Sequence, residues 1–374
     1  MWNLNITSLM HPTKYAKVNF INTEKSVFFS SLRANIDTYF EKNKIAKTGG
    51  NKLLFKACMM LGLYLIPFGL ILSGHFTNLQ MLFMTLVMGF GVAGVGMSVM
   101  HDAIHGSFSS SAAINRIFGA SLYLLGGNVY NWDIQHNRLH HTYTNIHDMD
   151  EDITGKFILR LSSDDKLKPI HRFQHIYAFF LYSLMTFSFL WKDFKEIKLY
   201  NKMAKTGIVP AFPKKELGIL ILTKFGYILF ICVLPLSVLN ITFGQWFLGF
   251  LVMHCTAGII LSTVFQLAHV VEGAAQPSPD EKGNIENAWA IHQLNTTANF
   301  SGRNKILSWY IGGLDYQVEH HLFPKISHIH YPAISSIVKK TAEDFGIMYN
   351  NKDSFMNGLR SHINMLYNLG HGLA

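Results

Sequence analysis

Charged and apolar residues are distributed unevenly along this chain, and their distribution predicts where it crosses a membrane. Residues 57–101 and residues 225–271 contain no Asp, Glu, Lys or Arg. Each block is long enough for two spans of about 20 residues joined by a short turn. A polar stretch interrupts each block, at residues 74–80 and 240–245. We therefore predict two transmembrane hairpins, with spans at about residues 55–73, 80–100, 219–239 and 246–267.

The placement of lysine predicts how these spans are oriented. Seven lysines lie between residues 192 and 215, and five more lie between residues 42 and 56. Neither predicted hairpin turn contains Lys or Arg. Because short loops rich in Lys and Arg stay in the cytoplasm, we expect both termini and the lysine-rich segments there. Lys224 lies inside the third span near its end, where its side chain is expected to reach the interface.

A third uncharged run, at residues 173–191, is 19 residues long and could also span. The lysine-rich segment that follows it is expected on the cytoplasmic side. In addition, an even number of crossings between His141 and His320 is needed if the histidine-rich motifs described below form one site. We therefore expect this run to be a helix in or near the membrane interface and not a fifth span.

The remaining segments indicate an all-α protein with a helical cap on the cytoplasmic side. Apolar residues recur at helical spacing between residues 27 and 40, which predicts an amphipathic helix lying on the membrane. The tail after Pro324 is expected to be helical and to contribute to the cap. We treat residues 1–374 as one domain, divided into a cytoplasmic or interfacial segment, the first hairpin, a cytoplasmic segment, the second hairpin and a cytoplasmic tail, at 1–52, 55–100, 101–218, 219–267 and 268–374.

Composition agrees with a membrane protein and excludes some functions. Hydrophobic residues make up 49% of the chain and charged residues 15%, against roughly 25% charged in soluble domains. The net charge of +9 suits contact with anionic lipid headgroups, and no basic tract with interleaved aromatic residues indicates nucleic-acid binding. The GFGVAG motif at residues 89–94 lies inside a predicted span, so we interpret its small residues as a helix-packing face and not as a nucleotide site.

Three histidine-rich motifs, HDAIH, HNRLHH and QVEHH, are the candidates for chemistry. His101 and His105 are four residues apart, which places both imidazoles on one face of a helix, about 6 Å apart along its axis. His136 and His140 repeat this spacing. His140 and His141 are adjacent and point about 100° apart on a helix, so they suit one ligand to each of two metal ions.

The third motif adds a second adjacent pair, His320 and His321, with Gln317 one turn before them. Seven histidines exceed the three protein ligands of a catalytic zinc. Neither the HExxH motif nor the Glu-x-x-His motif of ferritin-like centres is present. A single pair of histidines is usually structural, but three clusters on one predicted membrane face favour a dinuclear site. Imidazole binds iron, copper, nickel and zinc, so spacing alone leaves the metal open.

The motifs HxxxH, HxxxHH and QxxHH on a four-span chain resemble the membrane-bound fatty acid desaturases. The sequence DYQVEHHLFP resembles their front-end branch, which inserts a double bond between an existing one and the carboxyl end. The resemblance extends from His101 to Pro324. It implies that two irons activate O2 and that seven histidines are their ligands: His101, His105, His136, His140, His141, His320 and His321.

The resemblance also implies ligands outside the three motifs. The family has a histidine between its last span and the third motif, and His269 fits that position. Gln317 is a candidate to bind metal directly, to bind through water, or to orient a neighbour. His147 is a candidate further ligand or a contact of the ligands or substrate. The acids near the motifs are candidates to accept the second ring N–H of a ligating imidazole: Asp102, Asp148, Asp150, Glu151, Asp152 and Glu319.

The other histidines are expected to have different roles. His254 lies about 22 Å along a helix from His269, too far for the same site. His292 is interpreted as a polar neighbour, and His328 and His330 are expected to face solvent.

An unactivated C–H bond offers no acidic proton and no leaving group, so it calls for an oxidant. The resemblance implies an enzyme that uses O2 to insert a cis double bond into an acyl-CoA or acyl-lipid chain. The HPGG motif of a fused cytochrome b5 domain is absent from the sequence, so we expect electrons from a separate ferredoxin or cytochrome b5. The alternatives are a hydroxylase of a lipid or alkane on the same scaffold, and a non-enzymatic membrane zinc protein or receptor.

Overall fold

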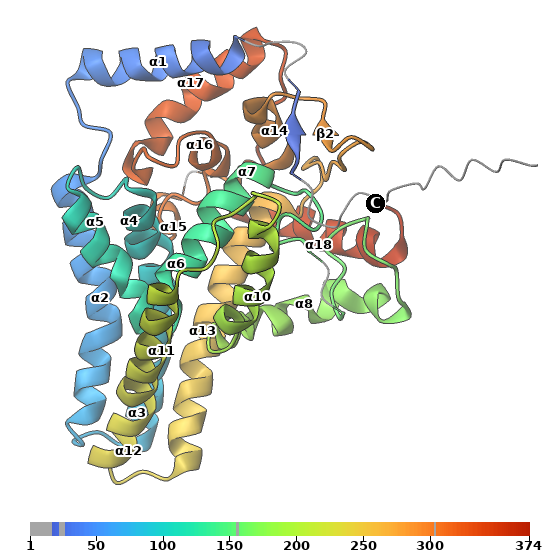
Figure 1. Cartoon of the computed structure of the whole chain (residues 1–374). Helices are drawn as coiled ribbons and strands as arrows, with labels where there is room; N and C mark the ends of the chain where they lie inside the picture. The colour runs from blue at the N-terminus through green and yellow to red at the C-terminus, as the bar shows by residue number, and fades with distance from the viewer. Residues whose placement is uncertain (1–16, 22–26, 155–156, 303) are drawn as a thin grey trace, which may run out of the picture.

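The computed structural model describes residues 17–21, 27–154, 157–302 and 304–374. Figure 1 shows a bundle of long helices with a cap of shorter helices at one end. Two short strands, β1 (Asn19–Phe20) and β2 (Asn284–Ile285), pair in parallel, and the described chain is otherwise helical or irregular. The expected all-α fold is confirmed.

Four helices are long and apolar enough to cross a membrane, as predicted. The second and third candidate spans each join two helices through a π-helical turn, at Gly96–Met100 and Leu229–Val233. The helices of the four spans are, in order, α2 (Gly50–Leu72); α3 (Asn78–Val95) with α4 (His101–His105); α11 (Lys214–Ile228) with α12 (Leu234–Val238); and α13 (Phe243–His269).

The predicted hairpin turns are where α3 and α13 begin, and their sequences explain why. Thr77 accepts a hydrogen bond from the backbone N–H of Gln80, whose side chain bonds back to Thr77. Thr242 and Gln245 form the same capping box at the start of α13. This arrangement satisfies two otherwise unpaired N–H groups at each helix start, so both turns are fixed locally.

Small residues let the spans approach closely. A Cβ atom on Gly89 would lie 2.6 Å from Thr256 Cβ and 2.7 Å from the carbonyl oxygen of Met253, both on α13. A Cβ atom on Gly91 would lie 2.5 Å from the backbone nitrogen of Tyr64 on α2. α3 therefore packs between α2 and α13 through its glycines, as the packing interpretation of GFGVAG predicted.

Residues 173–191 do not form a long span. They contain two short helices, α8 (Gln174–Ser183) and α9 (Met185–Ser188), and α8 packs across α13 in Figure 1. The side chains of Ile176 and Phe180 are exposed on α8, as expected for an apolar face that meets lipid at the interface. The candidate spans within the described residues do not include this run.

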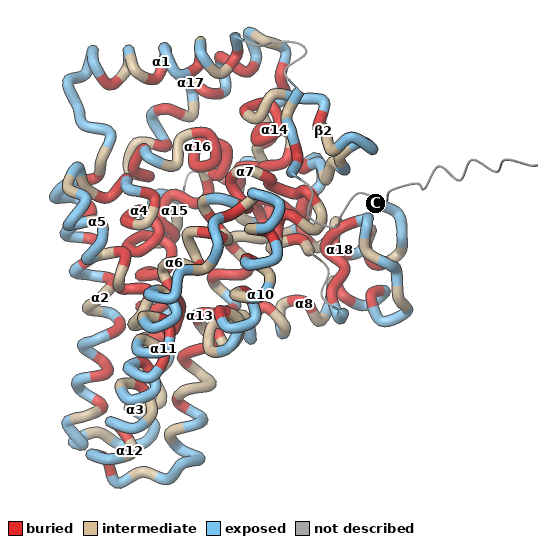
Figure 2. Tube along the Cα trace, in the orientation of Figure 1, coloured by how far each residue is buried: buried red, intermediate tan, exposed pale blue. Residues whose placement is uncertain are grey.

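The cap gathers helices from both halves of the chain around the upper ends of the spans, and Figure 2 shows that burial is densest where they meet. Short 3₁₀ turns at Ala120–Leu125, Pro169–Phe173 and His328–His330 connect several of them. The cap helices are α1 (Phe28–Asn43), α5 (Ala112–Gly119), α6 (Val129–Trp132), α7 (His141–Tyr143), α10 (Lys192–Ala204), α14 (Trp289–Thr296), α15 (Lys305–Tyr310), α16 (Gln317–Leu322), α17 (Tyr331–Asp344) and α18 (Phe355–His371).

The structure corrects the environment expected for the first helix. α1 is amphipathic as predicted, but its buried residues pack against α14, α16 and α17. Its apolar face is therefore covered by protein and not by lipid. Periodicity reveals an apolar face but not what covers it.

The expectation for Lys224 was also wrong. This lysine is buried, and its ammonium forms an ion pair with Asp193 of α10. It also donates to the carbonyl oxygens of Gly126 and Phe189. A buried charge is tolerated when it is paired and hydrogen-bonded, so Lys224 joins the third span to the cap and does not extend to the interface.

Candidate metal centre

Four chain segments bring histidines to the junction of the spans and the cap. These are α4, the turn leading into α7, the end of α13, and α16 (Figure 1). The donor nitrogens fall into two groups, within each of which all lie within 4.8 Å of one another. The first cluster is His101, His105, His136 and His320, and the second cluster is His140, His269 and His321.

His141 lies between the two clusters. Its Nε2 atom is 3.2 Å from Nε2 of His136, and its ring stacks on His321 with centroids 4.4 Å apart. The adjacent pair in the third motif is divided between the clusters: His320 belongs to the first cluster and His321 to the second. His269, expected from outside the three motifs, is in the second cluster.

The HNRLHH motif works differently from its predicted geometry. The rings of His136 and His140 stack with centroids 5.2 Å apart, as expected for one helix face, but their donor nitrogens belong to different clusters. The reason is that Asp133–His140 forms a π-helical turn. In such a turn residues five apart, not four, come together, and this brings His136 to His141. Single π-helical turns occur often at functional sites.

The chemistry of the donor set fits metal ions. Buried polar atoms normally have hydrogen-bond partners, yet several ring nitrogens here have none within the described structure. A metal ion bound by imidazole would satisfy them without adding buried carboxylate charge. The unpaired atoms are Nδ1 and Nε2 of His101, Nε2 of His105, Nδ1 of His141, Nε2 of His320 and Nε2 of His321.

Hydrogen bonds on the opposite ring nitrogens hold several imidazoles in place. His140 Nδ1 donates to Asp150 Oδ2 at 3.0 Å, and His321 Nδ1 donates to Gln293 Oε1 at 2.8 Å. His320 Nδ1 lies 3.2 Å from the Tyr331 hydroxyl. Such partners fix the tautomer and leave Nε2 for a metal.

Burial sets the protonation state of most of these rings. His140 is the exception among the rings. Burial lowers its pKa, but the neighbouring Asp150 carboxylate outweighs burial and raises the pKa to about 9. The other rings outside the spans are expected to be neutral at physiological pH and available as ligands. Burial, and then neighbouring imidazoles, lowers the pKa well below the ordinary value for His136, His141, His320 and His321.

The other candidates lie in different surroundings. His147 Nε2 is 2.9 Å from Asp165 Oδ1, outside both clusters. Glu319 accepts from Asn299 and Tyr349 and not from a clustered imidazole, and burial raises its pKa to about 7. Gln317 is buried on α16, and its role stays a prediction.

Among the acids proposed as imidazole partners, Asp150 fits best. Asp152 Oδ2 is 3.5 Å from His140 Nδ1, and Asp102 Oδ1 is 3.7 Å from His101 Nδ1. Asp102 is closer to His328, with Oδ2 2.9 Å from Nδ1. The expectation that His328 faces solvent is wrong, since only 5% of this residue is exposed.

The remaining histidines behave largely as expected. His292 is a polar neighbour, with Nε2 2.8 Å from the carbonyl oxygen of Thr144, and burial lowers its pKa to about 4. His254 lies far from the clusters and bonds Tyr227 and Thr186.

Several contacts of the clusters had not been predicted. Gln293 and Thr144 both bond to His321, and Trp132 stacks on His136 with centroids 4.4 Å apart. Tyr331 contacts His320 from α17. The polar residues around Gln293 were a weak indication that this segment lies near the site. No spacing rule predicts which cluster histidine each of these contacts meets, because the partners are distant in sequence.

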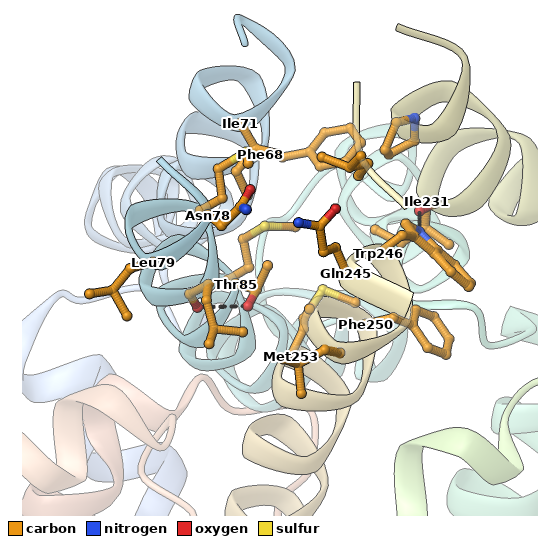
Figure 3. A pocket seen from close by; sticks show the side chains of 17 residues that line it. Phe68, Ile71, Asn78, Leu79, Thr85, Ile231, Gln245, Trp246, Phe250 and Met253 are labelled. Carbon is orange, nitrogen blue, oxygen red and sulfur yellow. Dashed lines mark hydrogen bonds between the residues drawn. The ribbon is translucent and has the colours of Figure 1, made fainter. Parts of the chain in front are cut away.

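An apolar pocket of about 300 Å³ lies between the spans at the other end of α3 and α13 (Figure 3). Phe68, Thr85, Trp246 and Met253 are among its lining residues. Sixteen residues separate Thr85 from His101, which is about 24 Å along a helix. This pocket is therefore separate from the histidine clusters.

A four-span helical membrane protein with two buried histidine clusters is the class that the fold and the site define. Residues 77–352 match the family model "Fatty acid desaturase". Over 349 residues the chain is 33% identical to the "sn-1 linoleoyl-lipid 6-desaturase" of Synechocystis sp., covering 93% of this chain and 97% of the relative. The chain therefore belongs to the fatty acid desaturase family, whose members are oxidoreductases.

Two further relatives are acyl-lipid desaturases by name. An "Acyl-lipid (8-3)-desaturase" of Physcomitrium patens is 33% identical over 360 residues, covering 96% of this chain and 74% of the relative. An "Acyl-lipid (8-3)-desaturase" of Mortierella alpina is 29% identical over 362 residues, covering 93% and 78%. The similarity includes all four spans and the histidine clusters.

Proposed function

We propose that this protein is an O2-dependent desaturase that inserts a cis double bond into an acyl chain carried by a lipid or by CoA. The observation that supports this most strongly is the pair of buried, all-imidazole clusters at the end of the spans. Imidazole ligands are neutral, so two metal ions can be held there without burying additional negative charge. Because the clusters lie at the end of the spans, their position suits a substrate that enters from the bilayer.

We propose that the two metals are iron and that eight histidines bind them. Bound iron would supply the oxidising chemistry that removes two hydrogens from an unactivated acyl chain. The ligands would be His101, His105, His136 and His320 for the first ion, His140, His269 and His321 for the second, and His141 between them.

The protein's own residues position these ligands and exclude water. Asp150 and Gln293 fix the ring orientations of His140 and His321 through Nδ1. Asp150 is itself held, because its Oδ2 atom also accepts from the backbone N–H of Asn145 at 2.9 Å. The eight histidines are all buried, so bulk water is excluded from the reacting atoms.

We infer that the new double bond is placed on the carboxyl side of an existing one. The names of the relatives support this, since they describe 6-desaturases of linoleoyl lipids and (8-3)-desaturases of acyl lipids. The QVEHH motif carries the same implication through the family resemblance.

We assign the clusters and both termini to the cytoplasmic side, because lysine-rich segments flank the spans there. Electrons would then come from a separate ferredoxin or cytochrome b5. We further propose that spans and cap act as one unit from residue 1 to residue 374, since the second cluster takes ligands from α13 as well as from α16.

The test is expression in a desaturase-deficient host fed defined mono- and di-unsaturated fatty acids. Products are identified by gas chromatography–mass spectrometry after derivatisation that locates each double bond. We expect a new double bond nearer the carboxyl end, absent with His320→Ala and retained with His75→Ala, which alters an exposed histidine in a hairpin turn. A hydroxylated product would assign hydroxylase chemistry instead. No product from iron-loaded protein supplied with a donor would contradict the proposal.

A further inference from the structure

A cavity of about 990 Å³ lies beside the first cluster, between the start of α2 and α15. Lysines and aromatic residues dominate its wall, and no acidic residue is among the described residues that line it. The lining residues that matter here are Lys52, Phe55, Lys56, Lys305, Trp309 and Tyr316. Its size suits a polar group of a small ligand or lipid.

The lysines of the cavity are of two kinds, exposed and buried. Lys52 and Lys305 are exposed and form no ion pair with another described residue, so their ammonium groups are free to bind an anion. Lys56 is only 2% exposed, and its Nζ atom is 2.9 Å from Nε2 of His328. Lys52 also lies in the first turn of α2, where the helix dipole favours negative charge.

The floor of the cavity is connected to the first cluster. His328, which binds Lys56, has its Nδ1 atom 2.9 Å from Asp102. Asp102 in turn lies 3.7 Å from Nδ1 of His101. A ligand on this floor would be separated from a cluster histidine by two side chains.

Exposed apolar residues lie beside the cavity. Phe55 on α2 is strongly exposed, and so are Leu54 and Met59 on the same span. Trp309 and the exposed Ile306 lie on α15 across the opening. Aromatic residues and lysines are the residues typical of the headgroup level of a bilayer. This composition is the one expected of a cavity that receives its ligand from the bilayer.

We propose that this cavity binds the phosphate group of the acyl carrier, supplied by the headgroup of a membrane glycerophospholipid. This inference rests on the proposed function. Lys52 and Lys305 bind the phosphate through charge-assisted hydrogen bonds, and Trp309 packs on the glycerol region. The carboxyl end of the acyl chain is thereby held at a fixed position close to the first cluster, so the site of oxidation is measured from that end.

The test compares lipid binding by the double variant Lys52→Gln/Lys305→Gln with binding by Lys195→Gln/Lys198→Gln. The second pair makes the same charge change at exposed positions on α10. Native mass spectrometry of detergent-solubilised protein measures binding of dilinoleoyl phosphatidylglycerol, and of a dilinoleoyl monogalactosyl lipid that lacks phosphate. Linoleoyl-CoA is the third probe, and it separates a lipid phosphate from a nucleotide phosphate.

We expect the cavity variant to bind the phospholipid at least about tenfold more weakly, with the galactolipid and the control variant unchanged. A loss confined to linoleoyl-CoA would keep the phosphate site but change the carrier. Equal losses in both variants, or none in either, would overturn the proposal. Binding needs no turnover, so the two proposals can fail separately. If the wild type has no desaturase activity but the cavity variant still loses phospholipid binding as expected, the proposed function is refuted and the phosphate site is retained.

Discussion

Each imidazole of the centre depends on a neighbour that fixes its orientation, and His140 shows this best. Asp150 accepts from its Nδ1 atom, while the neighbouring backbone N–H of Asn145 holds the carboxylate. The sequence predicted an acidic partner because four acids follow the second motif. It could not identify which of them bonds, because the contact depends on the turn at residues 145–150.

Replacing Asp150 by Asn tests this positioning. Asp150→Asn keeps the side-chain shape but removes the charge and allows the amide to turn its NH2 group toward His140. We expect metal affinity to fall about 10- to 100-fold, measured as metal retained during titration with a chelator. The matched control is Asp165→Asn, which alters the partner of His147 outside the clusters. Equal metal retention in both variants would argue against an orienting role for Asp150.

Sequence reasoning at this scale was right where chemistry is local and wrong where packing decides. The division of adjacent histidines between two ions follows from helix geometry alone, and the structure bears out this separation for His320 and His321. The pairing of His136 with His141 needs a π-helical turn, which the pattern of residues does not indicate. Glu319 was offered as an imidazole partner, but it bonds Asn299 and Tyr349 instead.

The elements were predicted better than the individual contacts. Four spans were predicted because charged residues are excluded from lipid. The polar interruptions predicted the two hairpin turns, and the capping boxes at Thr77 and Thr242 lie in these turns. The first span begins earlier than predicted, at Gly50. The added first turn contains Lys52, while Lys56 already lay within the predicted bounds and has its Nζ atom 2.9 Å from Nε2 of His328.

Helix packing through Gly89 gives a second prediction. In Gly89→Ala the new Cβ atom would meet the α13 backbone at 2.7 Å, and such overpacking costs about 1–3 kcal/mol. Gly69→Ala adds the same group where no atom lies within 4 Å. We expect a lower unfolding temperature for the first variant only, measured by scanning fluorimetry in detergent. An equal fall in the unfolding temperature of both variants would mean that the close α3–α13 contact at Gly89 does not determine stability.

The docking of α18 gives a prediction about pH. His362 Nδ1 donates to the carbonyl oxygen of Val270 at 2.7 Å, and its Nε2 accepts from Tyr182 at 2.9 Å. Burial lowers its pKa from 6.5 to about 4. Between these pH values the unfolded chain binds more protons than the folded chain, so stability falls as the pH falls from 6.5 to 4.

The matching experiment measures unfolding of wild type and His362→Gln across this pH range. The variant loses two hydrogen bonds and is expected to be less stable at pH 7. It lacks the titrating group, so the difference between the two proteins should shrink by about 3 kcal/mol as the pH approaches 4. A constant difference would show that His362 does not titrate in this way.

At the scale of the whole molecule, the spans explain why residues so distant in sequence form one centre. An even number of crossings returns the chain to the same end of the bundle, where α4, α13 and α16 meet. At the level of sequence, this convergence was taken as the reason for an even number of crossings, and lysine placement predicted the same topology. The packing of α1 against α17 and the ion pair between Lys224 and Asp193 were not predicted. Both depend on which surfaces the cap covers.

The most direct measurement is the metal content of the purified protein, by inductively coupled plasma mass spectrometry after expression in iron-replete cells. We expect two iron ions per chain, one for each histidine cluster. His269→Ala, which removes a donor from the second cluster alone, should lower the iron content while His75→Ala leaves it unchanged. One ion per chain, or zinc in place of iron, would contradict a di-iron centre built from these histidines.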